Sequence, residues 1–223
     1  MALDTGFGKV KLFDDFLGPA ITTNEWLANS DGGTGAITLQ VDGAALITTG
    51  TTDGHREALT QSLNWRASDG GPLTFEVRVK CVSEITTRAI FVGFTDLVTV
   101  ENPIEKDADS YSSNASDAVG FMYDTDAAIK RWYCVGVKGD NDVTPFDTGV
   151  APVADTYQTL RVVVDITGGA TYFIDGALVG SRKNAVTAST DLTPIMLIEN
   201  RTTTAARAIN VDYVYVEKGR AAA

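Results

Sequence analysis

The side chains that could do acid–base chemistry in this chain are almost all carboxylates. The 223 residues include 29 Asp and Glu but a single histidine, His55, and two cysteines, Cys81 and Cys134. A zinc site built on histidines therefore has too few ligands. A Ser–His–Asp triad would have to use His55, which lies in a stretch (residues 52–57) typical of a turn that leads into a strand, and no nucleophile elbow is present.

Two pairs of carboxylates in the sequence come nearest to the spacing of a catalytic pair: Asp124 with Asp126, and Asp140 with Asp142. Retaining glycoside hydrolysis needs two carboxyl groups about 5 Å apart. Alternate residues of a strand share a face, so a Glu-x-Asp-x-Glu run would line such groups up. No such run occurs, and both Asp pairs are flanked by turn residues and lack a glutamate. We therefore expect no catalytic residue, no enzyme activity and no set of converging acids that could do chemistry.

The same acidic segments are the candidates for a calcium site. Asp124–Asp126, Asp140–Asp142 and the segment 107–117 could each supply the oxygen ligands that Ca²⁺ prefers. None of them matches a complete calcium loop, and Asp and Asn are common in turns because of their local hydrogen bonds. We expect no cofactor-binding or metal-binding residue, with calcium as the alternative.

Three aromatic residues, Trp65, Tyr111 and Trp132, could stack on sugar rings if they were exposed. Trp132 and Tyr133 are neighbours in a strand-like segment, so one of them faces inward and the other outward. Most aromatic side chains of a β-sandwich are part of its core. Glycan binding is thus an alternative that the aromatic residues leave open.

The elements that must position these residues are β-strands. Residues 73–81 alternate strictly between apolar and polar types, and residues 88–94 are apolar on both faces, which indicates a central strand. The pair Asp42-Gly43 lies between two alternating runs, and this is the strongest short hairpin signal. Short strands with short connections form antiparallel sheets. Further strands are predicted at residues 119–123, 130–137, 159–166, 171–174, 177–180, 194–199 and 208–216.

Two stretches interrupt this pattern. Residues 95–117 are rich in Asp, Ser and Asn and are too long for a hairpin turn, so they predict a substantial surface loop. The turn at residues 138–142 and the acidic stretch with Pro145 and Pro152 predict a break in the sheet. No linker and no internal repeat divides the chain. We expect a single domain over residues 1–223, with residues 1–11 as a candidate N-terminal arm.

Composition narrows the range of partners. The chain has 18 Lys and Arg against 29 Asp and Glu, which gives a formal net charge of −11. This charge repels phosphate backbones and anionic membrane surfaces, so we expect neither a nucleic-acid nor a membrane partner. No apolar run resembles a signal peptide. We expect a protein made in the cytoplasm, in which the two cysteines are free and buried.

Several segments resemble landmarks of concanavalin A-like (LamG and glucanase-type) jelly rolls. The run Leu12-Phe13-Asp14-Asp15-Phe16 followed by Trp26 resembles the first strand of that family. Residues 157–165 leading into the hairpin at 172–176 resemble its most recognisable piece, and residues 211–216 resemble its closing strand. The resemblance implies an all-β, antiparallel two-sheet sandwich, in which the closing strand pairs near the first.

The opening segment at residues 6–18, together with the acidic charge, also resembles virion proteins of tailed bacteriophages. This resemblance implies a non-enzymatic capsid decoration (cement) protein, located in the virion and made in the host cytoplasm. Its partner would be the major capsid protein or another virion protein. A symmetric homo-oligomer, such as a trimer, is left open by the sequence. The alternative is a lectin-like carbohydrate-binding module of a tail fibre or capsid surface, with glycans as its partners. Glycoside hydrolysis ranks below both.

Overall fold

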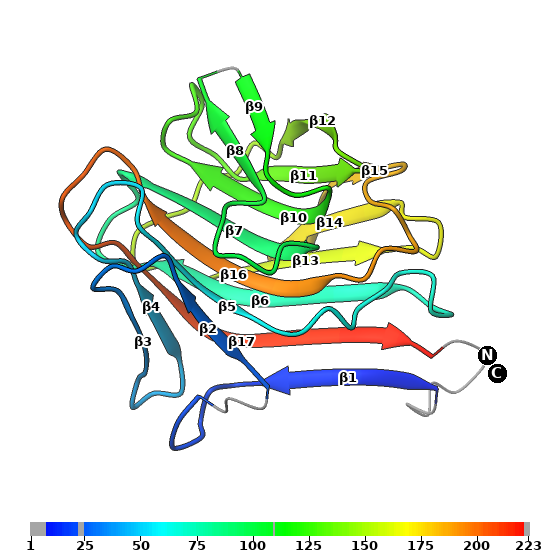
Figure 1. Cartoon of the computed structure of the whole chain (residues 1–223), viewed down its shortest axis with the longest axis horizontal. Coiled ribbons are helices and arrows are strands. Elements are labelled where there is room, and N and C mark those ends of the chain that lie inside the picture. Colours follow the sequence, from blue (N-terminus) through cyan, green and yellow to red (C-terminus); the bar gives the residue numbers. More distant parts are fainter. Residues whose placement is uncertain (1–7, 22–24, 109, 221–223) are drawn as a thin grey trace.

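Two antiparallel sheets form a sandwich in the computed structural model, which describes residues 8–21, 25–108 and 110–220 and has no α-helix among them (Figure 1). Within these residues, no helix is long and apolar enough to cross a membrane. In spatial order, sheet A consists of β15 (Ala177–Arg182), β14 (Ala170–Ile174), β13 (Gln158–Val164), β6 (Leu73–Cys81), β17 (Ala208–Gly219), β4 (Ala45–Thr48) and β3 (Ala36–Leu39), with β1 (Lys9–Asp14) also paired to β17. Sheet B consists of β12 (Asn141–Asp147), β11 (Tyr133–Lys138), β10 (Asp117–Asp124), β7 (Arg88–Thr95), β16 (Thr193–Asn200), β5 (Arg56–Thr60) and β2 (Leu27–Ser30).

The strand predictions with the strongest patterns are confirmed. Strand β6 alternates between buried and half-buried side chains along its whole length, and β7 lies in the middle of sheet B with every residue buried. Asp175 and Gly176 have φ values of 49° and 79°, the left-handed backbone that a type I′ hairpin turn requires. The closing strand β17 pairs with β1, as the resemblance implied.

The main core lies between the two sheets. It is made by the alternate side chains of each strand that face the opposite sheet. Phe75 and Phe94 meet across the layers with ring centroids 5.6 Å apart, and so do Phe121 and Tyr172 at the same distance. These aromatic contacts fix how the two sheets stack.

The segment predicted as a surface loop forms a second layer over sheet B. It contains a hairpin of β8 (Ile104–Asp107) and β9 (Ser110–Ser113), and we call the described residues from 97 to 115 the flap. A second apolar cluster fills the space between the flap and the outer face of sheet B, which is the face turned away from sheet A. The prediction of a substantial surface loop is incomplete, because the segment contains a hairpin and buries the side chains of Ile104 and Ala115 against sheet B. The buried members of this cluster are Ala58, Phe91, Ile104, Ala115, Ala118, Met122, Ala127, Tyr133, Val135, Val137, Ile195 and Leu197.

The predicted break after residue 138 is also wrong in part, because residues 141–147 form the edge strand β12. Pro145 is tolerated there for two reasons. An edge strand bonds to a neighbour on one side only, and the register between β11 and β12 shifts at this point. The proline therefore removes no ladder hydrogen bond that the sheet needs.

The candidate N-terminal arm falls partly outside the described residues, which begin at Gly8. Its last residues, Lys9–Lys11, belong to β1 and pair with β17 of the same chain. This part of the segment is therefore a strand of sheet A.

Candidate functional site

A row of polar side chains crosses the outer face of sheet B at the end of the apolar cluster. In the strand register, Glu199 of β16 lies opposite Arg56 of β5 on one side and Ala89 of β7 on the other, and Ala89 lies opposite Asp124 of β10. Two strand spacings therefore separate Glu199 from Asp124, with only the small side chain of Ala89 between them. Arg201, two residues beyond Glu199, bridges that interval.

The guanidinium of Arg201 joins the two buried carboxylates. Its Nη1 lies 2.7 Å from Glu199 Oε1, and its Nη2 lies 2.9 Å from Asp124 Oδ2. Its Nε faces Asp126 Oδ2 at 3.7 Å. Sequence reasoning had paired Asp124 only with Asp126, and it missed both Glu199 and Arg201.

Arg56 holds the other side of Glu199 and ties in the flap. Its Nε donates to Glu199 Oε2 at 2.9 Å, and its Nη2 lies 3.4 Å from Glu105 Oε1 on β8. Asn102, also in the flap, donates its Nδ2 hydrogen to Glu199 Oε2. Glu105 Oε2 faces Arg201 at 3.8 Å. The flap is thus attached to sheet B through the same network that neutralises Glu199.

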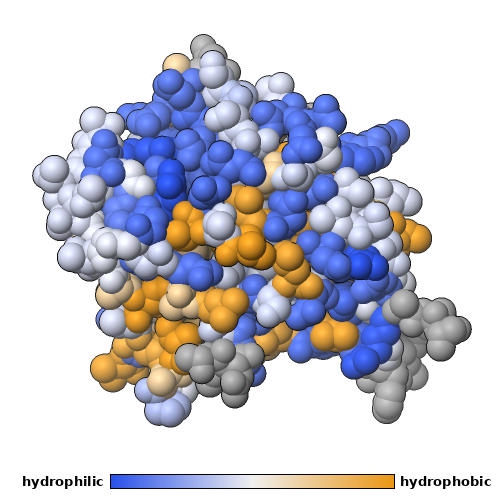
Figure 2. Space-filling view, in the orientation of Figure 1, coloured by the Kyte–Doolittle hydropathy of each residue, from blue (hydrophilic) through white to orange (hydrophobic). Residues whose placement is uncertain are grey.

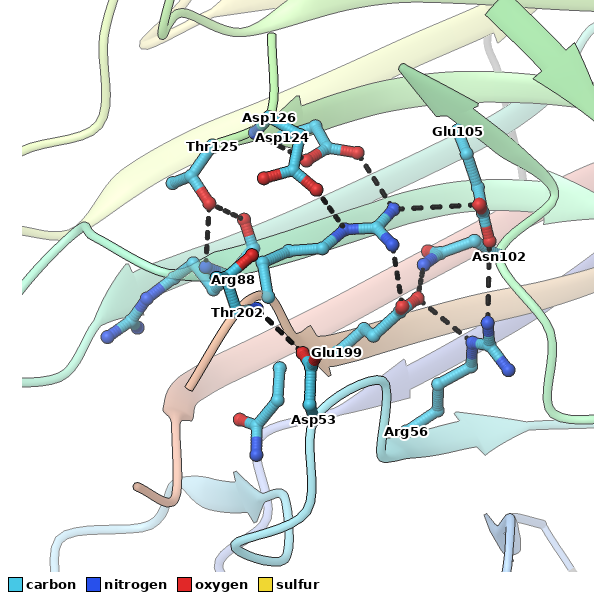
Figure 3. A network of polar contacts seen from close by, with 12 residues as sticks. Asp53, Arg56, Arg88, Asn102, Glu105, Asp124, Thr125, Asp126, Glu199 and Thr202 are labelled. Atoms are coloured by element: carbon cyan, nitrogen blue, oxygen red, sulfur yellow. Dashed lines mark hydrogen bonds and ion pairs between the residues drawn. The ribbon is translucent and has the colours of Figure 1, made fainter. Parts of the chain in front are cut away.

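Acidic side chains that are distant in the sequence do converge in this structure. Four carboxylates, those of Glu199, Asp124, Glu105 and Asp126, gather around two guanidinium groups (Figure 3). They escaped prediction because they come from β16, from the flap and from the end of β10, which are far apart in the sequence. The available signal was weak: Glu199 and Arg201 are charged residues spaced by two at the end of a run of apolar residues.

Burial determines the protonation chemistry of this network. Glu199 is 1% exposed, and its burial raises the pKa of its carboxyl to about 7, although Arg201 and Arg56 oppose the rise. Burial likewise raises the pKa of Asp124, against the effect of Arg201. An acid with a pKa near neutrality could serve as a proton donor in catalysis. Whether it does depends on the access that a substrate would have to its oxygens.

Every oxygen of the two central acids is already engaged. Glu199 Oε1 accepts from Arg201, and its Oε2 accepts from Arg56 and Asn102. Asp124 Oδ1 accepts the backbone N–H of Asp126, and its Oδ2 accepts from Arg201. The flap and the second apolar cluster cover the sheet beside them. This arrangement supports the fold, and every carboxylate oxygen of Glu199 and Asp124 has a hydrogen-bond donor among the described residues.

A small pocket remains at the outer border of the network. It has a volume of about 260 Å³ and is lined by β8, β9, Asp126 and Arg201. The ring of Tyr111 faces it, but Lys106 Nζ lies 3.9 Å from the centre of that ring and its ammonium donates to the Tyr111 hydroxyl at 2.5 Å. One face of the aromatic ring is therefore already occupied by a cation.

The other predicted residues lie apart from this site. Trp65 and Trp132 are 6% and 2% exposed, so neither can stack on a sugar. Trp132 faces the core between the sheets while Tyr133 faces the flap, which confirms that the two point in opposite directions. Asp140 accepts a hydrogen bond from Ser116 in an exposed turn. Asp142 lies in β12, opposite Val137 of β11. Among the described residues, no three His, Cys, Asp or Glu side chains are arranged to hold a metal ion.

His55 and the two cysteines have structural surroundings. His55 is buried and accepts the backbone N–H of Gly50 at its Nδ1, while its Nε2 lies 2.8 Å from Asp31 Oδ1. Cys81 and Cys134 are buried and free, as predicted. Burial raises the pKa of the Cys81 thiol to about 11 and that of the Cys134 thiol to about 12, so neither is a reactive thiolate at neutral pH.

The fold is a concanavalin A-like jelly roll, the class of fold found in both lectins and glycoside hydrolases. The carbohydrate recognition domain of Emp47p is similar, with a TM-score of 0.64 and 13% identity over 94% of this chain and 95% of that one. A β-glucanase of Bacillus licheniformis is similar with a TM-score of 0.62 and 11% identity, over 92% of this chain and 97% of the enzyme. Peanut lectin has a TM-score of 0.62 and 9% identity, over 94% and 97% of the two chains. No family model and no curated protein matches the sequence.

The raised pKa of Glu199 predicts a specific pH dependence of stability. Because the folded state binds this proton more tightly than the unfolded state, stability should fall as pH rises from about 4.5 through the folded pKa of about 7. The shift corresponds to at most about 3 kcal/mol. We expect thermal melts of the wild type to show a lower Tm at pH 8 than at pH 5.5.

Glu199→Gln should flatten this dependence, because the amide is neutral at every pH in that range. Glu101→Gln is the matched control, since Glu101 is an exposed acid in the flap. If the Tm of Glu199→Gln fell with rising pH as steeply as the Tm of the wild type, another group would be responsible for the pH dependence.

Proposed function

We propose that the chain is a non-enzymatic structural protein of a tailed-phage virion, which attaches to the outside of the capsid and stabilises it. The observation that carries the non-enzymatic part is the occupied state of Glu199 and Asp124. Their oxygens are held by Arg56, Arg201 and backbone groups, under a flap that closes this face of sheet B.

The opposite face of the sandwich supports an attachment role. The outward side chains of the central strands of sheet A, β6 and β13, are half-buried. Across the outer face of sheet A, neighbouring strands place Phe13, Tyr215, Glu76, Arg161 and Phe173 in one row. Phe13 is 61% exposed. A broad face with aromatic and charged side chains suits contact with another protein surface. The resemblance of the opening segment to phage virion proteins supplies the choice of partner, the capsid.

The proposal is tested with capsids of the phage whose genome encodes the chain. Particles that lack the protein should lose resistance to heat, and adding the purified protein back should restore it and leave the protein bound after sedimentation. Unchanged heat resistance, with no protein in the sedimented particles, would overturn the proposal.

Carbohydrate binding is the second candidate function. The pocket of about 260 Å³ beside Tyr111 favours it, and Emp47p and peanut lectin are fold neighbours whose names denote carbohydrate recognition. Glycan-array binding that Tyr111→Ala abolishes, together with failure to bind capsids, would place this candidate first. Tyr157→Ala is the matched control, because Tyr157 also packs against cationic side chains but lies outside the pocket.

A further inference from the structure

The strands of sheet A place more positive than negative side chains on their outer face, although the chain has a formal net charge of −11. Alternate residues of β6, β13 and β17 lie in the core between the sheets, so the residues between them face outward. Strand β1 joins this face through its pairing with β17. The outward charged side chains of these four strands are those of Lys9, Lys11, Arg78, Lys80 and Arg161, against Glu76, Asp212 and Glu217.

The side of the molecule that carries the flap has the opposite character. The charged residues in the described part of the flap are three acids and one cation: Glu101, Glu105, Asp107 and Lys106. Figure 2 shows hydrophilic residues over this part of the surface, at the top of the view. An acidic partner surface is therefore repelled by the flap and attracted by the outer face of sheet A.

Arg161 lies in the central part of this outer face and has unused hydrogen-bond donors. In the strand register it lies between Glu76 of β6 and Phe173 of β14. Its guanidinium carbon lies 4.4 Å from the centre of the Phe173 ring, and its Nη1 lies 3.8 Å from Glu76 Oε2, which is too long for a hydrogen bond. Its N–H groups have no acceptor in the part of the chain that the structure describes. The side chain is 39% exposed, so a partner can reach it.

Arg78 shows how an arginine on the same face is satisfied. Its guanidinium carbon lies 4.2 Å from the centre of the Tyr157 ring, and its Nη1 donates to Asp212 Oδ2 at 2.6 Å. Its side chain is 40% exposed, almost the same fraction as that of Arg161. Arg161 thus has the same aromatic support as Arg78 but lacks a carboxylate that accepts its hydrogen bonds.

A hollow beside Arg161 has room for such a carboxylate. It has a volume of about 360 Å³ and is lined by Thr159, Arg161, Phe173, Gly176, Glu76 and Asp175. The two acids of the hollow are held by their neighbours, because Glu76 Oε1 accepts the Tyr213 hydroxyl and Asp175 Oδ1 accepts the backbone N–H of Thr159. The guanidinium therefore stays open to a carboxylate from outside.

From these features we propose that the outer face of sheet A docks an acidic segment of the partner protein, and that Arg161 receives one of its carboxylates. A guanidinium binds a carboxylate through two parallel hydrogen bonds, and arginine and aromatic side chains carry much of the binding energy at protein interfaces. Lys80, whose Nζ lies 4.7 Å from the centre of the Tyr157 ring, supplies a second cation. This inference rests on the proposed attachment to a capsid and identifies the face and the chemistry of the contact.

The substitution Arg161→Met tests the anchor, because it removes the donors and keeps an apolar stem over Phe173. Arg131→Met is the matched control: it makes the same change in net charge, but Arg131 lies outside sheet A and pairs with Asp147. Binding to capsids is measured by sedimentation at about 0.1 M salt, where the Debye length is about 10 Å and distant charges are screened. We expect Arg161→Met to bind about tenfold more weakly than the wild type and Arg131→Met to bind like the wild type. Equal melting temperatures of the two variants would verify that both fold.

The sign of the partner's charge is tested at Glu76. Glu76→Gln removes the carboxylate nearest to Arg161, so an acidic partner should bind severalfold more tightly, whereas a basic partner should bind more weakly. Glu101→Gln, in the flap, makes the same change in net charge and is the control. Weaker capsid binding after Glu76→Gln, or equal effects of the two substitutions, would overturn the inference.

Fluorescein-labelled hexaglutamate separates this inference from the proposed function. If the wild type and Arg161→Met sediment equally with capsids, the attachment stands and the inference fails. If the wild type does not sediment, the proposed function fails, and the hexaglutamate assay alone decides. Binding that is about tenfold weaker for Arg161→Met than for Arg131→Met would then support the inference, and equal or absent binding would overturn it. Self-association of the wild type in light scattering that Arg161→Met abolishes would also overturn it, in favour of a second copy.

Discussion

Replacing Arg201 with methionine is expected to lower the free energy of unfolding by about 3 to 5 kcal/mol, because it leaves two buried carboxylates without their shared cation. Glu199 and Asp124 are 1% and 0% exposed, and Arg201 contacts both at 2.7 and 2.9 Å. The methionine retains the apolar stem of the arginine, so the loss reports on charge more than on packing. Urea unfolding at pH 8, above the pKa of about 7 that Glu199 has in the wild type, measures the effect.

A second substitution tests the cause of that loss. In the background of Arg201→Met, Glu199→Gln should recover part of the lost stability, since it removes one of the two charges that Arg201 no longer balances and leaves Arg56 as the cation nearest that position. Arg66→Met is the matched control: Arg66 pairs with Asp191 on the surface, where an ion pair contributes little. Similar losses for Arg66→Met and Arg201→Met would mean that burial of the network is not what makes Arg201 important.

Replacing Gly93 with alanine (Gly93→Ala) is expected to lower the free energy of unfolding by about 3 kcal/mol. Gly93 has a φ of 154°, and a Cβ there would lie 2.3 Å from the carbonyl oxygen of Val119 on the neighbouring strand. In the register Gly93 lies opposite Gly120, whose own Cβ would lie 2.3 Å from Val92 O. The two glycines let β7 and β10 approach closely in the middle of sheet B. In a chain of this size the loss corresponds to a drop in Tm of roughly 6 to 12 °C.

Gly180→Ala is the control for Gly93→Ala. A Cβ at Gly180 would meet only side-chain atoms, at 3.2 to 3.4 Å, and Phe146 among them is half exposed and can shift. Calorimetric melts should place Gly180→Ala within a few degrees of the wild type. If Gly93→Ala melted at the wild-type temperature, the close approach of the two strands would be wrong.

Single strands and tight turns could be predicted from the sequence, because their conformation depends on neighbouring residues. The alternation in residues 73–81 gives the two faces of β6, and Asp175-Gly176 gives a turn, since each signal lies within a few residues of its effect. The strand β12 could not be predicted, because Pro145 indicates a break unless the strand is known to be an edge.

The candidate site could not be predicted for a related reason. Arg201 bridges Glu199 and Asp124 only because three strands align them on either side of Ala89, and this register is a tertiary property. The flap is similar: Ile104 and Ala115 stand in a polar stretch that resembles a loop, and their burial depends on the apolar outer face of sheet B. The composition of that stretch gives no sign of the surface that receives it.

The central claim is that the acids of sheet B hold the fold together and do no chemistry on a substrate. A reducing-end assay on a panel of polysaccharides and oligosaccharides tests it most directly, with the wild type, Glu199→Gln and Asp124→Asn compared with heat-denatured protein. We predict no release of reducing ends above the denatured control by any of the three. Cleavage by the wild type that both substitutions abolish, while both variants stay folded, would contradict the claim.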